Sequence, residues 1–152
     1  VLLQRLLPSK EAKLINSRKT NVKKGIMTRI NCGIPPCELT DKHLMAEHRE
    51  IKRIPNCIKK GRYSMTGQPE VFTLGKGHVK FFYNKLKYLH NRYTRLYLEC
   101  KNRGFNVTDY HLAWDGIPDH LNNDYQPTEN DRKIIRERIQ ERLNKSNPKT
   151  ID

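Results

Sequence analysis

The sequence predicts an all-α protein in which one compact helical domain follows an extended, basic N-terminal arm. Three observations lead to this prediction. The chain has 152 residues, which is long enough for one domain and too short for two. Its clearest periodic pattern, between residues 79 and 100, has the spacing of a helix. Its first 26 residues differ sharply in composition from the rest of the chain.

Residues 1–26 are predicted to form a basic extension outside the domain. They hold seven Lys or Arg residues against one acid, Glu11, a net charge of +6 that leaves +8 of the total of +14 to residues 27–152. The segment has little apolar surface to bury, so alone in water it should be disordered. Its start, LLQRLL, has some character of a targeting segment, which favours a mitochondrial or other organellar matrix over other intracellular compartments.

The first helix is expected from Thr40 to about Arg53. Thr40 can cap the helix, Asp41 follows in its first turn, and no helix breaker occurs before Pro55. Residues 59–70 contain two glycines and a proline, and they are predicted to form a loop.

The longest helix is expected from about residue 79 to residue 103, because apolar residues recur there at steps of three and four. These residues are Val79, Phe82, Leu86, Leu89, Tyr93, Leu96 and Cys100. Gly104 can end the helix in a left-handed conformation. Lys80, Lys87 and Arg95 on its other face are either candidate contacts to a polyanion or ordinary members of a solvated face.

The last part of the domain is predicted to be irregular and then helical. Residues 105–127 contain a Trp, a Gly and two Pro residues, and they should pack over the core without regular structure. A final helix should begin near Thr128, because Thr128 and Asp131 resemble a capping box with Asp in place of Glu. The domain is therefore expected to span residues 27–145, and the polar tail 146–152 should fray.

Composition also limits the partners. The net charge of +14 favours a polyanion, which is either nucleic acid or an anionic membrane. No apolar run is long enough to cross a bilayer, and residues 1–26 contain no clear amphipathic helix, so no membrane partner is expected. Among the four cysteines only Cys32 and Cys37 are close in sequence, and no second pair follows. Reduced thiols are therefore expected rather than a metal site.

Four sequence blocks carry a resemblance to a known family. They are MTRIN at 27–31, ELTDKHLMAEHREIKR at 38–53, LGKGHVKFFYNKL at 74–86 and ECKNRGFNV at 99–107. In this order and spacing they resemble pyrimidine-dimer DNA glycosylases of the endonuclease V family, over residues 27–143. The resemblance implies a three-helix domain that needs no cofactor. It also implies an enzyme that cleaves the glycosidic bond of a cyclobutane pyrimidine dimer and then nicks the strand by β-elimination.

The resemblance implies that Thr28 and Glu50 are the catalytic residues. In the family the nucleophile is the α-amine of a threonine that is exposed when the initiator Met is removed, and this threonine matches Thr28. An α-amine titrates near about pH 8, against about 10.4 for lysine, so more of it is unprotonated at neutral pH. A free amine can attack the sugar C1′ and form an imine. Glu50 matches the acid that stabilises the developing sugar cation and transfers protons.

Further matches concern contacts to nucleic acid. The family's phosphate-binding arginines match Arg29, Arg49 and Arg53, and a helix-borne histidine matches His43. Helical spacing agrees, because Arg49 and Arg53 are one turn apart and His43 shares a face with Glu50. The alternative for these residues, judged without the family, is a surface cluster of ion pairs.

The GKGH motif is a further candidate site for phosphate. Lys76 and His78 stand at the start of a predicted helix, where two glycines allow close approach to exposed backbone N–H groups. A structural role for His78 in capping the helix is equally consistent with this position.

Two features depart from the family. The chain ends in RLNKSNPKTID, which lacks the aromatic residues of the phage-type tail, so the resemblance does not extend to lesion specificity. In addition, residues 1–26 precede the motif, so the nitrogen of Thr28 is an amide whose lone pair is delocalised and cannot form an imine.

Two functions therefore follow from the sequence. For the chain with residues 1–26 attached, the sequence favours a catalytically silent binding module. This module would be a structural RNA-binding subunit of a large ribonucleoprotein, such as a mitochondrial ribosome, and would contact neighbouring proteins. The alternative is a DNA glycosylase and abasic-site lyase that acts on duplex DNA once Thr28 becomes the N-terminus.

Overall fold

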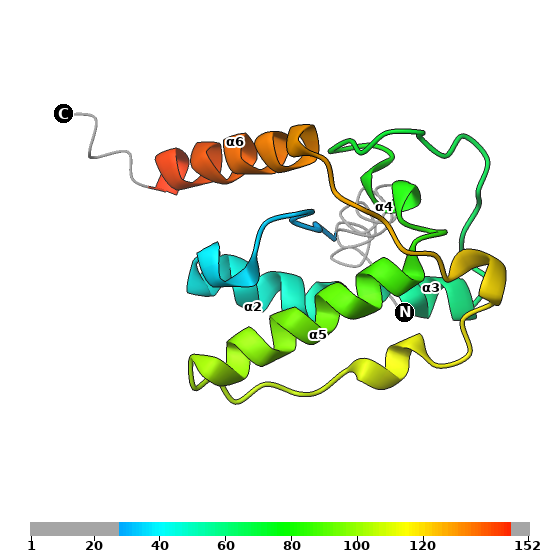
Figure 1. Ribbon diagram of the computed structural model, residues 1–152, viewed down its shortest axis with the longest axis horizontal. Coiled ribbons are helices and arrows are strands. Elements are labelled where there is room, and N and C mark those ends of the chain that lie inside the picture. The colour runs from blue at the N-terminus through cyan, green and yellow to red at the C-terminus, as the bar shows by residue number, and fades with distance from the viewer. Residues whose placement is uncertain (1–27, 147–152) are drawn as a thin grey trace, which may run out of the picture.

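The computed structural model describes residues 28–146 (Figure 1). The predicted basic arm, residues 1–26, lies outside the described residues, as does the tail beyond Ser146. The predictions made for these two segments therefore remain predictions.

The described residues form helices joined by irregular segments. In chain order the elements are η1 (Pro36–Glu38), α2 (Asp41–Glu50), α3 (Arg53–Lys59), α4 (His78–Phe81), α5 (Leu86–Asn102), η2 (His111–Trp114), η3 (Asp119–Leu121) and α6 (Glu129–Ser146). Between residues 28 and 146 no strand forms, and the β-type pairing there is an isolated bridge between Lys85 and Asn122. None of these helices is long and apolar enough to cross a membrane. The all-α prediction is confirmed.

The core lies between α2 and α5, which pack side by side (Figure 1). The apolar stripe of α5 is buried from Leu86 to Cys100 and belongs to one cluster with Leu44 of α2 and Ile51, which directly follows α2. On the opposite side α6 closes the core with Ile135. The N-terminal segment, residues 28–34, runs between α6 and the α2–α5 pair, as Figure 1 shows.

The long helix expected from residue 79 is interrupted before Leu86. A continuous helix would bond the Tyr88 N–H to the Asn84 carbonyl. Instead the Asn123 side chain donates to the Asn84 carbonyl at 2.9 Å, and the Tyr88 N–H donates to the Asn123 carbonyl at 3.2 Å. Lys85 has φ −127° and ψ 42°, outside the helical region. A distant loop therefore supplies the bonds that divide this segment into α4 and α5.

The first predicted helix also differs from the structure at its C-terminal end. The cap is as expected, since Thr40 Oγ1 accepts a hydrogen bond from the His43 N–H at 3.1 Å. However, α2 ends at Glu50, and α3 begins at Arg53 as a separate helix. Pro55 lies in the first turn of α3, where its missing N–H breaks no helical bond. The three expected helices are thus present as α2, α5 and α6, and α3 is an additional one.

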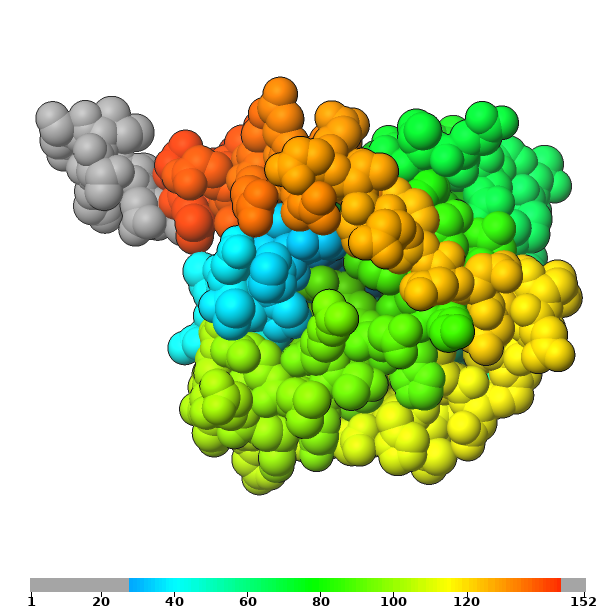
Figure 2. Space-filling view, in the orientation of Figure 1, coloured from blue at the N-terminus to red at the C-terminus, as the bar shows by residue number. Residues whose placement is uncertain are grey.

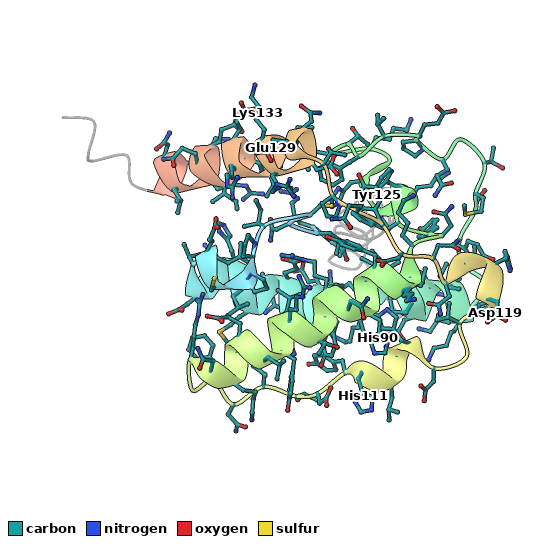
Figure 3. All side chains as sticks on the ribbon, in the orientation of Figure 1. His90, His111, Asp119, Tyr125, Glu129 and Lys133 are labelled. Carbon is teal, nitrogen blue, oxygen red and sulfur yellow. The ribbon has the colours of Figure 1, made fainter. Side chains whose placement is uncertain are left out.

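The capping box predicted for the last helix is confirmed. The Asp131 N–H donates to Thr128 Oγ1 at 3.1 Å, and the Thr128 N–H donates to the Asp131 carboxylate at 3.0 Å. Asp131 also accepts a hydrogen bond from the Tyr125 hydroxyl (Figure 3). These contacts anchor the start of α6 to the irregular segment before it.

Candidate functional site

The candidate nucleophile and the candidate acid lie side by side at the end of α2. Thr28 is 7% exposed, and its Oγ1 donates a hydrogen bond to the Glu50 carbonyl at 3.4 Å. Glu50 is the last residue of α2, and its side chain is 22% exposed, so a ligand can reach its carboxylate. The Arg49 guanidinium lies 3.5 Å from this carboxylate. The two residues matched by the catalytic motif, 22 positions apart in sequence, therefore meet in space.

Arg29 extends this site with a cation that is poorly paired. Its side chain is half-buried, and its Nε has no hydrogen-bond partner among residues 28–146. Burial is the first cause that lowers the pKa of Arg29 to about 10, and the charges of Arg138 and Arg142 lower it further. The Glu50 charge acts in the opposite direction. Two arginines and one carboxylate thus act on Arg29, and a phosphate group could supply a further anion to this group of cations.

His43 stands in the same electrostatic environment. Its Nδ1 is buried without a hydrogen-bond partner in the described part of the chain. Burial lowers its pKa, and the nearby charges that lower it further come from Lys42, Arg142, Arg29 and Arg138. His43 is therefore favoured in its neutral form, which can donate one hydrogen bond and accept another.

Two arginines of α6 belong to this environment and were not assigned any role from the sequence. Arg138 and Arg142 are one helical turn apart, and their charges reach both Arg29 and His43. The spacing in RERIQER was a visible signal, because residues four apart share a helix face. It could not show which surface that face would meet. We call the three cations Arg29, Arg138 and Arg142, together with the neutral His43 beside them, the cationic cluster.

Arg49 and Arg53 lie on the exposed side of the α2–α3 junction. The Arg49 side chain is 56% exposed, and Arg53 is also exposed. Lys52 between them has a pKa lowered first by burial and then by Arg53 and Arg49. Arg49, Lys52 and Arg53 thus form a second group of cations at this junction.

His78 differs from the expectation of a phosphate ligand, because it is 3% exposed. Its Nε2 accepts a hydrogen bond from the Ile30 N–H at 2.9 Å, and its Nδ1 lies 2.8 Å from the Thr73 carbonyl. Burial lowers the pKa of His78 to about 4. The neutral imidazole, protonated on Nδ1, therefore joins two backbone segments in the interior and does not reach a phosphate on the surface.

The other cations proposed from the sequence lie elsewhere. Lys76 is exposed in the loop before α4, and Lys80 donates to the Thr66 carbonyl of the preceding loop. Lys87 is exposed on α5. Arg95 lines a groove between α5 and the segments 33–37 and 124–127, which Figure 2 shows as a hollow between these elements. The residues that line this groove include neither Thr28 nor Glu50.

The remaining histidines and cysteines form no metal site within the described residues. His90 stacks on Trp114 with ring centroids 5.2 Å apart, and His111 pairs with Asp109 at 3.1 Å (Figure 3). Cys32 is buried, and burial raises its thiol pKa to about 12. Cys37 is exposed.

A compact helical domain with a carboxylate next to clustered cations is typical of a protein that binds a polyanion. A sequence model of the pyrimidine dimer DNA glycosylase family matches residues 27–112. This match covers more than half of the chain, so the protein belongs to the pyrimidine dimer DNA glycosylase family, as its motifs indicated. The family implies a function on nucleic acid and binding to DNA. The matched range includes Thr28 and Glu50 and ends before α6.

Proposed function

We propose that the protein is a DNA glycosylase and abasic-site lyase whose nucleophile is the α-amine of Thr28, released when the bond between Met27 and Thr28 is cut. The observation that carries this proposal is the contact between Thr28 and Glu50 next to Arg29, on which the charges of Arg138 and Arg142 also act. The family acts on DNA, and this favours the enzymatic alternative over the ribosomal subunit that the basic extension suggested.

The proposed chemistry uses the amine as a nucleophile. The nitrogen lone pair forms a bond to the sugar C1′ while the bond from C1′ to the base breaks, and the base leaves with the bonding electron pair and takes up a proton. The nitrogen then loses a proton, and the C1′–O4′ bond breaks as the imine double bond forms, so that O4′ takes up a proton. Glu50 would stabilise positive charge on the sugar and transfer the protons that this step and the β-elimination require. Its place at the exposed end of α2 supports both tasks.

The cationic cluster would serve both binding and chemistry. Its charges repel one another in the free protein, and phosphate groups of DNA would relieve this repulsion. Nearby positive charge also disfavours protonation of an amine, which keeps more of the nucleophile in its reactive form. Arg49 and Arg53 would hold phosphates on either side of the reacting nucleotide.

The attached extension makes the full chain a latent enzyme in this proposal. While Met27 is joined to Thr28, the nitrogen is an amide and cannot form an imine. The same observation favours a second candidate, a silent module that binds RNA through the net charge of +14. In that case the extension would contact RNA within a larger particle, such as a mitochondrial ribosome.

Borohydride trapping on duplex DNA with one abasic site tests the proposal. Three chains are compared: residues 1–152, residues 27–152, and residues 28–152 with a free α-amine at Thr28. We expect a covalent adduct with the third chain and none with the second, which differs from it by one residue. No adduct with any chain, together with salt-dependent RNA binding by residues 1–152, would overturn the enzyme and support the binding module.

A further inference from the structure

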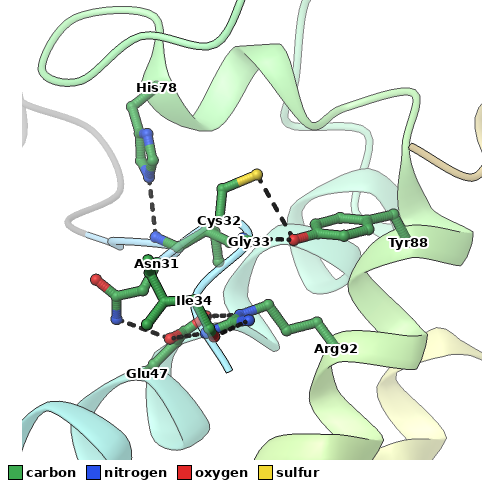
Figure 4. Close-up of polar contacts among 9 residues, drawn as sticks. Asn31, Cys32, Gly33, Ile34, Glu47, His78, Tyr88 and Arg92 are labelled. Carbon is green, nitrogen blue, oxygen red and sulfur yellow. Dashed lines mark hydrogen bonds and ion pairs between the residues drawn. The ribbon is translucent and has the colours of Figure 1, made fainter. Parts of the chain in front are cut away.

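The segment from Ile30 to Ile34 is buried although it has no regular secondary structure. Ile30 and Cys32 are fully buried, and Asn31 and Ile34 are nearly so. Backbone polar groups in the interior need partners that a helix or sheet would otherwise provide. For this segment, side chains of α4 and α5 bond to the backbone, and a side chain of α2 bonds to the Asn31 side chain (Figure 4).

Each partner holds a different point of the segment. The contacts are Ile30 N–H to His78 Nε2 at 2.9 Å, Asn31 Nδ2 to Glu47 Oε1 at 2.7 Å, Gly33 N–H to the Tyr88 hydroxyl at 3.3 Å, and Arg92 Nη1 to the Ile34 carbonyl at 2.9 Å. His78 belongs to α4, Glu47 to α2, and Tyr88 and Arg92 to α5. We call His78, Glu47 and Arg92 the buried bracket.

The centre of the bracket is an ion pair between Glu47 and Arg92. Their side chains are 1% and 5% exposed. Arg92 binds the carboxylate through two nitrogens, with Nη2 2.9 Å from Oε1 and Nε bonded to Oε2. Burial is the largest single cause and lowers the pKa of Arg92, but the charge and the hydrogen bond of Glu47, together with Tyr88 and Cys32, outweigh it, and the pKa is raised. The Arg92 guanidinium therefore stays ionised in the interior.

Stability alone does not explain such a pair. Removing two charges from water is costly, and well-packed apolar residues often stabilise a core as well or better. Apolar side chains could hold α2 against α5, but they could not bond to the segment beside them. Glu47 also accepts from Asn31, and Arg92 also donates to the Ile34 carbonyl. The pair thus holds residues 31–34 in one position relative to both helices, and this position sets the register of the segment.

That register determines where Thr28 can lie. Thr28 is two residues before Ile30, so the nitrogen of Thr28 can move only within about 7 Å of the Ile30 amide, at about 3.3–3.6 Å per residue. A slip of one residue would move the amine by about 3.5 Å, which exceeds the tolerance of a reacting pair, where about 1 Å can cost about 100-fold in rate.

We propose that Glu47, Arg92 and His78 are positioning residues, whose buried bracket fixes the register of residues 30–34 so that the nitrogen of Thr28 lies at Glu50. This inference rests on the proposed function, because it concerns the same amine. None of the three touches the reacting atoms. His78 and Arg92 act through the backbone of the N-terminal segment, and Glu47 acts through the Asn31 side chain.

The test compares two positions of the amine in two backgrounds. The first background is the parent chain, and the second is Glu47→Leu with Arg92→Met, which removes the ionic bonds and keeps apolar volume. Each is made beginning at Thr28 and, separately, with one additional Gly before Thr28. Single-turnover strand cleavage at an abasic site gives the rate, and binding to DNA with a non-cleavable abasic analogue gives the dissociation constant.

The expected result is a loss of positional selectivity. In the parent the chain beginning at Thr28 should react about 100-fold faster than the Gly-extended chain. In the double variant the rate from Thr28 should fall about 10- to 100-fold, and the ratio between the two amine positions should approach one. The dissociation constant should change less than about threefold, because the surface cations are retained.

The outcomes separate the two proposals. If the parent beginning at Thr28 does not react at all, the proposed function is wrong. If the parent reacts and the folded double variant keeps its rate and its ratio, the bracket has no positioning role. Should the double variant fail to fold, Asn31→Ala removes one bracket contact and leaves the ion pair. Asn31→Ala should reduce both the rate and the ratio several-fold, and an unchanged ratio would overturn the inference.

Discussion

The two ends of the segment from Thr28 to Ile34 lie in opposite electrostatic environments. At the Thr28 end Arg29 Nε and His43 Nδ1 are buried without hydrogen-bond partners in the described structure. At the Ile34 end Arg92 and Glu47 bond to each other and to the segment. A paired interior holds its geometry without a ligand, whereas a surface at which Arg29 Nε and His43 Nδ1 have no hydrogen-bond partner among the described residues is suited to a polyanion. The difference separates a surface suited to binding from the interior that supports it.

The largest expected effect comes from a change of Glu50, whose carboxylate lies at the Thr28 end of the segment. In the chain that begins at Thr28, Glu50→Gln should reduce single-turnover cleavage of abasic DNA by about 100-fold or more, because acid–base catalysis contributes about 10²- to 10⁴-fold. The exposed Glu137→Gln on α6 is a matched control. If Glu50→Gln cleaves as fast as this control, the carboxylate has no part in the reaction.

In the interior, His78, which bonds to Ile30, should make the stability of the protein depend on pH. Its pKa is about 4 in the folded protein, below the ordinary 6.5, so the unfolded chain binds more protons between these values. Stability should therefore be fully present above about pH 6.5 and fall as pH drops toward 4, by about 3 kcal/mol in total. Denaturation of the parent and of His78→Gln at several pH values measures this as the difference between the two curves. Parallel curves would contradict the assignment.

The α6 arginines test the binding role of the cationic cluster. The double change Arg138→Gln and Arg142→Gln should weaken duplex DNA binding about 10-fold near 0.1 M salt and reduce the salt dependence of log K by about 1 to 2. Lys101→Gln, in the last turn of α5, removes a cation elsewhere and serves as the control. If Lys101→Gln weakens DNA binding as much as the double variant does, net charge and not the cluster determines affinity.

The smallest effect concerns the close packing of α6 on the N-terminal segment. Gly33 and Gly104 both have positive φ, at 83° and 85°. A Cβ on Gly33 would lie 2.7 Å from Arg132 Cγ, whereas a Cβ on Gly104 would meet open space. Each change to Ala should cost about 1 kcal/mol from backbone strain, and Gly33→Ala about 1 kcal/mol more. Thermal unfolding of both variants gives the difference, and equal values would show that Arg132 moves without cost.

Much of the fold was visible in the sequence because its signals are local. The caps at Thr40 and Thr128 involve residues three positions apart, and the apolar stripe of α5 repeats every helical turn. The sequence blocks at 27–31 and 38–53, which contain Thr28 and Glu50, indicated the family, and the match over residues 27–112 confirms it. The assignment of individual roles to these residues remains a prediction.

Other features became visible only in the tertiary structure, because they depend on residues far apart in the chain. Asn123 divides the long helix at Asn84 from a distance of 39 positions, and Ile30 draws His78 into the interior across 48 positions. Arg138 joins Arg29 only because α6 folds back over the N-terminal segment. Periodicity and capping by themselves indicated the segments that become α2, α5 and α6, since their bonds close within a few residues. Burial and pairing of polar groups required the whole chain, because no local pattern specifies which distant atom will satisfy them.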